Sequence, residues 1–265
     1  ITSVEIFDPQ TNSWTAGVAL SAGRSHAAAV ALESKIYLVG GRGGSSKVEA
    51  FDPQAGAWAE VAPMPTGRSQ LAAAVVGGRL FAIGGLGGGI YLSTVEAFDP
   101  QTGVWAAVAP MPTARCAAGV AVLEGKIYVV GGYDENDDLL ARVEVYDPAT
   151  NAWSQAPPMS TPREYSGVAA LGGKLYAAGG YDGTALSSVE VFDPQTQTWA
   201  PIASMSTERQ FPMVAAVQGK LYAAGGDDGN EYTLDSVEAY DPQQNRWEAV
   251  ASMSSTHDVG AVAAL

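Results

Sequence analysis

The chain is poor in cysteine, histidine and positive charge, and each shortage argues against a class of protein. One cysteine cannot form an internal disulfide framework, and two histidines offer few ligands for a metal centre. Only 14 Lys and Arg stand against 28 Asp and Glu, which argues against nucleic-acid binding because phosphates are bound by clustered cations. The longest run without a charged side chain has 16 residues, five of them Gly. We therefore expect no transmembrane helix and no membrane partner.

An internal repeat fills the 265 residues. Asp-Pro recurs six times at intervals of 44 to 48 residues, each time preceded by Val-Glu and followed by a Trp. Five periods carry a Met six residues after the Trp, five carry an Arg beyond that position, and five carry a Gly-Gly doublet. The Asp-Pro pairs begin at Asp8, Asp52, Asp99, Asp147, Asp193 and Asp241. Self-similarity at such a period is the signature of repeat architectures.

Four short apolar runs separated by turn signals make up each period, and this pattern predicts β-strands rather than helices. We label the strands a to d in chain order. In one period strand a is 27–32, strand b is 35–39, strand c is 48–51 and strand d starts near Trp58. Turns of two or three residues join a to b, and Asp-Pro turns join c to d. Each period therefore predicts one four-stranded antiparallel meander.

A single meander cannot cover its own two faces, whereas radial stacking of such sheets in a β-propeller covers both. Strand a is almost entirely Ala, Gly and Val, as a crowded axis requires, and the aromatic residues lie further along each period. The Gly-Gly doublet, Val-Glu-x-aromatic-Asp-Pro, Trp, Met and Arg together resemble the kelch repeat over essentially the whole chain. Kelch-like propellers include substrate adaptors of ubiquitin ligases, actin binders and enzymes. The resemblance thus implies a fold without choosing a function.

We expect one domain, residues 1–265, forming an all-β, six-bladed kelch-type propeller of four-stranded antiparallel blades. Five complete blades would span approximately 22–62, 66–109, 113–157, 161–203 and 207–251. The terminal blade would be shared by the two termini, from 255–265 and 1–18, and would lack its second strand. Either the parent protein continues past Leu265, or another chain or segment fills this position, since an unpaired strand edge invites strand addition.

Most of the net negative charge belongs to the repeat itself. The six Val-Glu glutamates and the six Asp-Pro aspartates account for 12 of the 28 acids, and the other 16 nearly balance the 14 cations. Because the strands alternate in direction, the a–b and c–d turns share one face, and the b–c and d–a loops share the other. The b–c loops vary in length and composition, so we expect recognition on their face.

The same face carries the repeated Arg. Two positions after each Arg, the alternation of side chains along a strand predicts a second set of side chains on the same side, at the mouth of the channel. Arg offers a planar fork of donors to carboxylates, and Tyr165 and Phe211 add apolar area. We expect an acidic or polar peptide, or a small anion, over the axis. The alternative is that each Arg pairs with a Glu and holds the ring together. The candidate binding residues are Arg24, His26, Arg68, Gln70, Arg115, Arg163, Tyr165, Arg209, Phe211 and His257.

Catalytic chemistry has little support in the residues. The ligand sets of kelch-like copper and iron proteins are missing, so we expect no cofactor and no metal and assign no catalytic residue. Arg115 could lower the pKa of the adjacent Cys116 thiol, but no base partner can be argued. Glu164, with Arg163 and Tyr165, is the one plausible local acid–base cluster.

We predict a non-enzymatic protein- or peptide-binding scaffold that uses the face made by the b–c and d–a loops. One alternative is a carbohydrate-acting or isomerising kelch-like enzyme. Another is a repeat protein that self-associates, or accepts a donated strand, at the incomplete blade. Nothing at Ile1 resembles a signal peptide, and both cytoplasmic and exported locations stay open.

Overall fold

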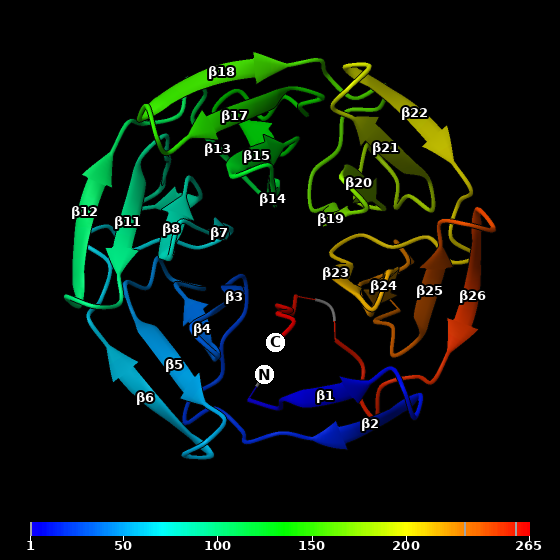
Figure 1. The fold of residues 1–265 in the computed structure, drawn as a ribbon, viewed down its shortest axis with the longest axis horizontal. Helices are drawn as coiled ribbons and strands as arrows, with labels where there is room; N and C mark the ends of the chain where they lie inside the picture. The colour runs from blue at the N-terminus through cyan, green and yellow to red at the C-terminus, as the bar shows by residue number, and fades with distance from the viewer. Residues whose placement is uncertain (1, 231, 258) are drawn as a thin grey trace.

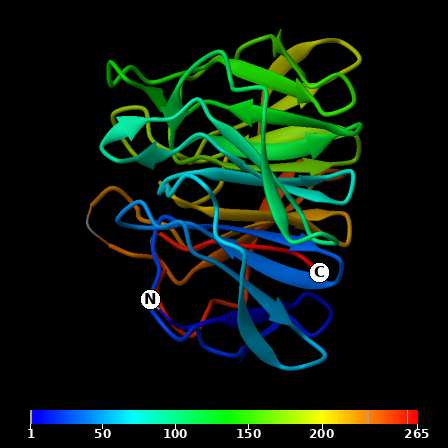
Figure 2. The ribbon, with the colours of Figure 1, turned by 90° about the vertical axis from the view of Figure 1, so that its left-hand side faces the viewer.

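The protein is a ring of small antiparallel sheets in a computed structural model that describes residues 2–230, 232–257 and 259–265. Figure 1 shows the sheets arranged around an axis, and Figure 2 shows the ring edge-on, with its longer loops leaving one side. These described residues form strands and turns but no helix, and therefore no helix able to cross a membrane. The predictions of an all-β chain and of a propeller are confirmed.

Five sheets have four strands each, paired in the order a-b-c-d, and each sheet is one blade. The first blade comprises β3 (Ala28–Leu32), β4 (Lys35–Val39), β5 (Val48–Asp52) and β6 (Ala57–Val61). The second comprises β7 (Ala72–Val76), β8 (Arg79–Ile83), β11 (Val95–Asp99) and β12 (Val104–Val108). The third comprises β14 (Gly119–Leu123), β15 (Lys126–Val130), β17 (Val143–Asp147) and β18 (Ala152–Ala156). The fourth comprises β19 (Gly167–Leu171), β20 (Lys174–Ala178), β21 (Val189–Asp193) and β22 (Thr198–Ile202). The fifth comprises β23 (Met213–Val217), β24 (Lys220–Ala224), β25 (Val237–Asp241) and β26 (Arg246–Val250).

Short pairings between loops order one face of the ring. A hairpin of β9 (Leu86–Gly87) and β10 (Ile90–Tyr91) forms the b–c loop of the second blade. In the third blade β13 (Arg115–Cys116) pairs with β16 (Tyr133–Asp134), which joins the d–a loop to the b–c loop. Single bridges make the equivalent link in other blades, at Ser69–Leu86, Glu164–Tyr181 and Gln210–Asp227. The d–a and b–c loops therefore build one continuous surface.

The prediction of six blades is wrong, because the described chain forms five four-stranded blades. Between the fifth blade and the first lies a two-stranded sheet of β1 (Glu5–Asp8) and β2 (Ser13–Ala16). Residues 259–265 run beside it without forming a strand. The physical reason is the missing strand b, since a chain segment at the strand a position has no ladder partner without it. We call residues 2–20, 251–257 and 259–265 the closing sector.

The head and the tail of the chain lie side by side in the closing sector, as Figure 1 shows. Glu5 accepts hydrogen bonds from the hydroxyls of Ser254 and Ser255, each at 2.7 Å, and its Oε1 lies 3.0 Å from His257 Nε2. The indole of Trp14 donates to the carbonyl of Ala251 at 2.8 Å. These contacts join segments more than 230 residues apart in the sequence and close the ring.

The repeated Trp links each sheet to the preceding one. Each indole Nε1 donates to a backbone carbonyl in the d–a segment of the preceding sheet, at 2.8 or 2.9 Å. The repeated Asp has a local role, because its Oδ1 accepts the backbone N–H two residues later in all six c–d turns. The repeat motif thus encodes both the turn within a blade and the contact between blades.

Small residues let the inner strands approach one another at the axis. A Cβ on Gly119 would lie 2.2 Å from Val168 Cγ2, and one on Gly167 would lie 2.2 Å from Val214 Cγ2. Both glycines begin the first strand of a blade, and the contact is to the first strand of the next blade. The crowding expected from the composition of strand a is therefore real at these positions.

Candidate functional site

The repeated Arg side chains point into their own blades rather than into the channel. Arg209, which precedes the first strand of the fifth blade, is 0% exposed. Its guanidinium donates to the carbonyls of Gly225 and Ser236 at 2.8 and 3.0 Å, and it pairs with Glu238 at 3.1 Å. Four further blades repeat this pattern, with ion pairs Arg24–Glu49, Arg68–Glu96, Arg115–Glu144 and Arg163–Glu190 at 2.8 to 3.0 Å.

This geometry accounts for the candidate arginines as structural residues. The Gly-Gly carbonyl and the Val-Glu carboxylate of one blade converge on one guanidinium, so three parts of the repeat meet at a single buried group. The pairs follow the alternative reading of the sequence, in which each Arg bonds a Glu of its own blade. His257 takes the place of Arg in the closing sector, where it is 6% exposed and contacts Glu5. The hypothesis that these six side chains present charge to a ligand does not fit their burial.

The residues two positions beyond each Arg do surround the channel mouth. His26, Gln70, Ala117, Tyr165 and Phe211 all adopt left-handed backbone geometry, with φ between 51° and 58°. Their backbones are linked around the axis by hydrogen bonds from Gln70 N to His26 O, Ala117 N to Gln70 O, Tyr165 N to Ala117 O and Phe211 N to Tyr165 O. These bonds hold in place a conformation that non-glycine residues seldom adopt. A cavity of about 130 Å³ lies between these residues and Val259.

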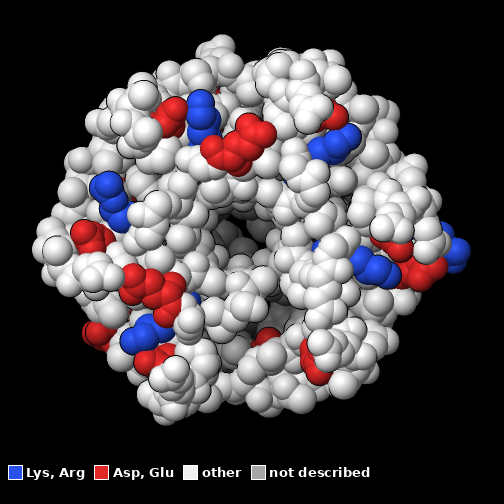
Figure 3. Space-filling view, in the orientation of Figure 1, with Lys and Arg blue, Asp and Glu red and all other residues white. Residues whose placement is uncertain are grey.

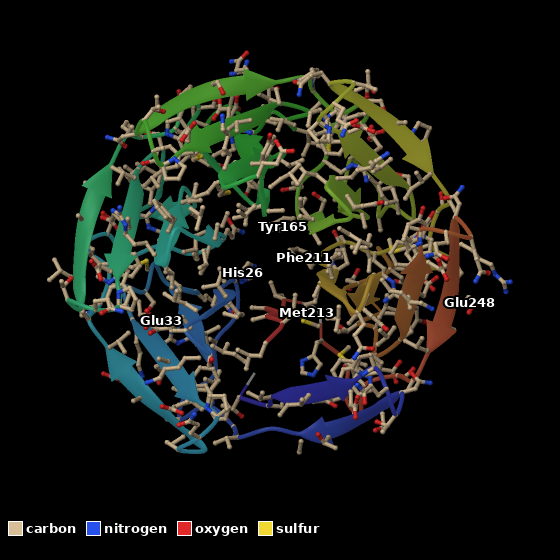
Figure 4. The ribbon with its side chains drawn as sticks, viewed as in Figure 1. His26, Glu33, Tyr165, Phe211, Met213 and Glu248 are labelled. Carbon is tan, nitrogen blue, oxygen red and sulfur yellow. The ribbon has the colours of Figure 1, made fainter. Side chains whose placement is uncertain are left out.

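The mouth is aromatic on one side. Tyr165 and Phe211 pack with ring centroids 4.0 Å apart, and the rings of His26 and Phe211 lie nearly perpendicular with centroids 6.4 Å apart. Figure 4 shows these three side chains next to one another, pointing toward the axis from three separate blades. The cluster extends outward over the b–c loops, because Tyr133 contacts Tyr165 at 6.4 Å and Tyr91 contacts Tyr133 at 5.5 Å. We call these five residues the aromatic track.

Comparison with known proteins agrees with the repeat. A family profile described as the KLHDC2/KLHL20/DRC7 Kelch-repeats domain matches residues 2–161 and 109–259. The chain belongs to the kelch-repeat family. A search of curated proteins finds no significant match. The solved structure of YjhT is similar to this kelch chain with a TM-score of 0.82 and 17% identity, over 92% of this chain and 88% of that one. At that identity the similarity concerns the fold alone.

Acidic groups gather beside this kelch mouth. Burial, together with the nearby charge of Asp137, raises the pKa of Glu164 to about 7. The hydroxyl of Tyr91 donates to Asp137 Oδ1 at 2.6 Å, and this bond raises the pKa of Tyr91 to about 12. The loop 133–142 contributes four carboxylates and one Arg. The region around the aromatic track is therefore predominantly acidic.

The single thiol of the kelch chain is not activated. Burial raises the pKa of Cys116 to about 12, and the side chain of neighbouring Arg115 is directed to Glu144 instead. The Cys116 Sγ–H donates to Gln70 Oε1 at 3.2 Å, and Gln70 in turn donates to the hydroxyl of Tyr165. The expectation that Arg115 could lower the pKa of this thiol is therefore wrong, and Cys116 belongs to the support of the mouth.

The repeat pattern of the sequence does not identify two members of the aromatic track. Tyr91 and Tyr133 lie in b–c loops whose lengths differ, so no repeat position identified them. A signal did exist for Tyr133, which follows directly on a Gly-Gly doublet, where strand b ends at the mouth. Among the predicted candidates, the structure brings together His26, Gln70, Tyr165 and Phe211, and it directs the arginines and His257 elsewhere.

Proposed function

We propose that this kelch propeller is a non-enzymatic scaffold that binds a peptide segment of another protein across the channel mouth. The observation that carries the proposal is the aromatic track, which runs without interruption from the b–c loop of the second blade to the axis. The equivalent mouth positions in other blades are Gln70 and Ala117, so the repeat itself does not demand aromatic residues there. Aromatic side chains such as Tyr are enriched among the residues that contribute most to binding at protein interfaces.

The charge around the mouth favours a neutral or basic ligand. The acidic ligand expected from the sequence required the repeated guanidinium groups, and these are buried in ion pairs within their blades. What surrounds the track instead is Glu164 and the four carboxylates of the loop 133–142. A Lys or Arg of the ligand placed over a Tyr ring would gain both cation–π and ionic attraction.

The enzyme alternative rests on Glu164, because a carboxyl with a pKa of about 7 can act as a general acid or base near neutral pH. Its expected partners are not set up to assist it. Arg163 is 0% exposed and pairs with Glu190, and burial raises the pKa of Tyr165. The scaffold is therefore the better supported function, and turnover of a sugar or sugar acid by the wild-type chain would contradict it.

The test is a titration with fluorescent nine-residue peptides that share two aromatic residues and differ only in charge. Wild-type protein should bind the basic and neutral peptides more tightly than the acidic one. Tyr165→Ala and Phe211→Ala should each weaken binding by roughly 30-fold, as expected for an anchor that contributes about 2 kcal/mol. Ala117 holds the equivalent position with φ 54°, so alanine fits this backbone.

Tyr232→Ala is the matched control, because Tyr232 is 70% exposed on a b–c loop of the fifth blade and its ring has no contact with the described aromatic track. This variant should bind like wild type. Equal loss in all three variants, or tighter binding of the acidic peptide, would contradict the proposal. If no peptide binds and Tyr165→Ala only lowers the melting temperature, then Tyr165 and Phe211 fill the channel to stabilise the fold, and the proposal is wrong.

A further inference from the structure

One position for a strand is unfilled in the closing sector. In the five blades strand b pairs on one side with strand a and on the other with strand c. β1 occupies the strand c position and pairs with β2, but no described strand pairs with its other edge. Between that edge and residues 259–265 lies a cavity of about 190 Å³, lined by side chains that include Trp14, Leu38, Met213 and Ala263. We call this space the strand slot.

Apolar side chains of the closing sector are exposed, among them Ile6, whose counterparts in other blades are buried. Seven large hydrophobic side chains are exposed in the described chain, and four of them lie in the closing sector: Ile6, Val18, Val262 and Leu265. Ile6 is 51% exposed, whereas Ala50 and Ala97, at the same position in strand c of the first two blades, are 6% and 3% exposed. In those blades the residue paired with this position is the aromatic residue of strand b. Ile6 thus lacks the aromatic cover that strand b supplies elsewhere.

The aromatic contacts between sheets show what kind of side chain is missing. The aromatic residue of each strand b packs against the aromatic residue of the next strand c, with centroids 5.3 to 6.1 Å apart. This series ends with Tyr222 against Phe7 of β1. In the described chain Phe51, the next residue in the series, meets only the ring of Trp58 in its own blade. An aromatic side chain in the strand slot would face Phe51.

The charges point to the same occupant. In four blades the first residue of strand b is a Lys that pairs with the last Asp of strand c, at 2.9 to 3.9 Å. Such opposite charges lie side by side around the face drawn in Figure 3. Asp8 holds this position at the end of β1, and no cation of the described chain pairs with its carboxylate. A basic residue at the start of the occupant would complete the pattern.

We propose that the strand slot binds an extended polypeptide segment from outside residues 1–265, added antiparallel to the free edge of β1. Its sequence would follow strand b of this chain: a basic residue, Leu or Ile, an aromatic residue, two small apolar residues and Gly-Gly. Backbone hydrogen bonds to β1 supply affinity, and side-chain contacts with Asp8, Ile6 and Phe51 supply specificity. The occupant comes from outside the described chain, since its own five b strands are each paired on both sides.

The experiment uses the labelled peptide Gly-Lys-Leu-Tyr-Ala-Ala-Gly-Gly, the sequence of residues 173–180 and again of 219–226. Fluorescence anisotropy should show saturable 1:1 binding, and the unlabelled peptide should raise the melting temperature of the protein. Ile6→Asp should weaken binding roughly 10- to 100-fold through lost apolar burial. Asp8→Asn should weaken it about two- to fivefold, as for an exposed ion pair.

Two controls separate the strand slot from the rest of the surface. Ile90 is 63% exposed in the β9–β10 hairpin, so Ile90→Asp makes the same change outside the closing sector and should leave binding unchanged. Tyr165→Ala should also leave it unchanged, which keeps this site distinct from the channel mouth. If Ile6→Asp fails to fold, Asp8→Lys replaces it: this variant should prefer a peptide whose Lys is replaced by Glu.

Three results would overturn the proposal. The first is equal binding of a scrambled peptide, and the second is no binding at millimolar concentration. The third is a concentration-dependent dimer that the peptide does not dissociate, which would make a second copy of the chain the occupant.

Discussion

Replacing Arg209 by Met tests whether the repeated arginines are structural. The substitution keeps the length and apolar stem of the side chain but removes a guanidinium that is 0% exposed. Glu238, whose side chain is 3% exposed, then loses its cation, and the carbonyls of Gly225 and Ser236 lose a donor. Breaking a buried ion pair by removing one partner costs about 3–5 kcal/mol. For a domain of this size that lowers the melting temperature by roughly 6–20 °C.

The assay is equilibrium urea unfolding followed by the fluorescence of the six Trp residues. Arg246→Met is the matched control, because Arg246 is a 66% exposed strand residue that pairs with Glu248 at 3.4 Å, and exposed pairs contribute about 0–1 kcal/mol. Adding Glu238→Gln to Arg209→Met should recover part of the loss, since no unpaired charge is then buried. If Arg209→Met destabilises the protein no more than Arg246→Met, the structural role is refuted and Arg209 returns as a candidate for ligand binding.

Three further substitutions have defined outcomes. Glu164 binds its proton more tightly in the folded chain than in the unfolded chain, so the stability of the wild-type protein should fall as pH rises from about 4.5 to about 7. Glu164→Gln should abolish this pH dependence in unfolding experiments. The control Glu124→Gln, in an exposed turn, should keep it. Burial alone would raise the pKa of Glu5, but hydrogen bonds from Ser254, Ser255 and His257 outweigh it and lower the pKa to about 2. Its contribution is therefore present above pH 4.5 and lost as pH falls toward 2, so Glu5→Gln should destabilise the protein at pH 7 and not at pH 2. Gly167→Ala should cost about 1–3 kcal/mol through overpacking against Val214. Val214→Ala in the same chain should relieve only part of this cost in urea unfolding, because the Cβ that it keeps also lies 2.6 Å from the added Cβ.

The sequence predicts the blades well because their information is local and repeated. Asp-Pro turns, Gly-Gly doublets and short apolar runs act within a few residues of one another, and the pairing of β3 to β6 follows directly from them. The repeated Trp also makes the contact between blades, although the hydrogen bond from its indole to the preceding sheet is visible only in the structure. The number of blades could not be settled in the same way. A segment such as 259–265 has strand composition but becomes a strand only if a neighbour pairs with it.

The candidate site, too, could be predicted only in part from the sequence. Alternation along strand a places Tyr165 and Phe211 at the mouth, but it is not the reason that they line the cavity there. Both residues precede strand a and have left-handed φ values, and Arg163, two positions before Tyr165, is buried in its own blade. Alternation could not tell where a long side chain such as Arg163 ends, since its guanidinium reaches Ser188 and Glu190, which lie more than 20 residues away in sequence. Tyr91 and Tyr133 belong to loops that the repeat leaves variable, and only the folded chain brings them to Tyr165.

Both proposals depend on a ring that closes through the docked head and tail with one strand position unfilled. Amide hydrogen exchange of β1, measured beside that of β25, tests this most directly. The account predicts that alternate β1 amides are protected by β2 while those facing the strand slot exchange rapidly, and that every amide of β25 is protected. Uniform protection along β1, or exchange throughout β1 and β2 as fast as in an unfolded chain, would contradict it.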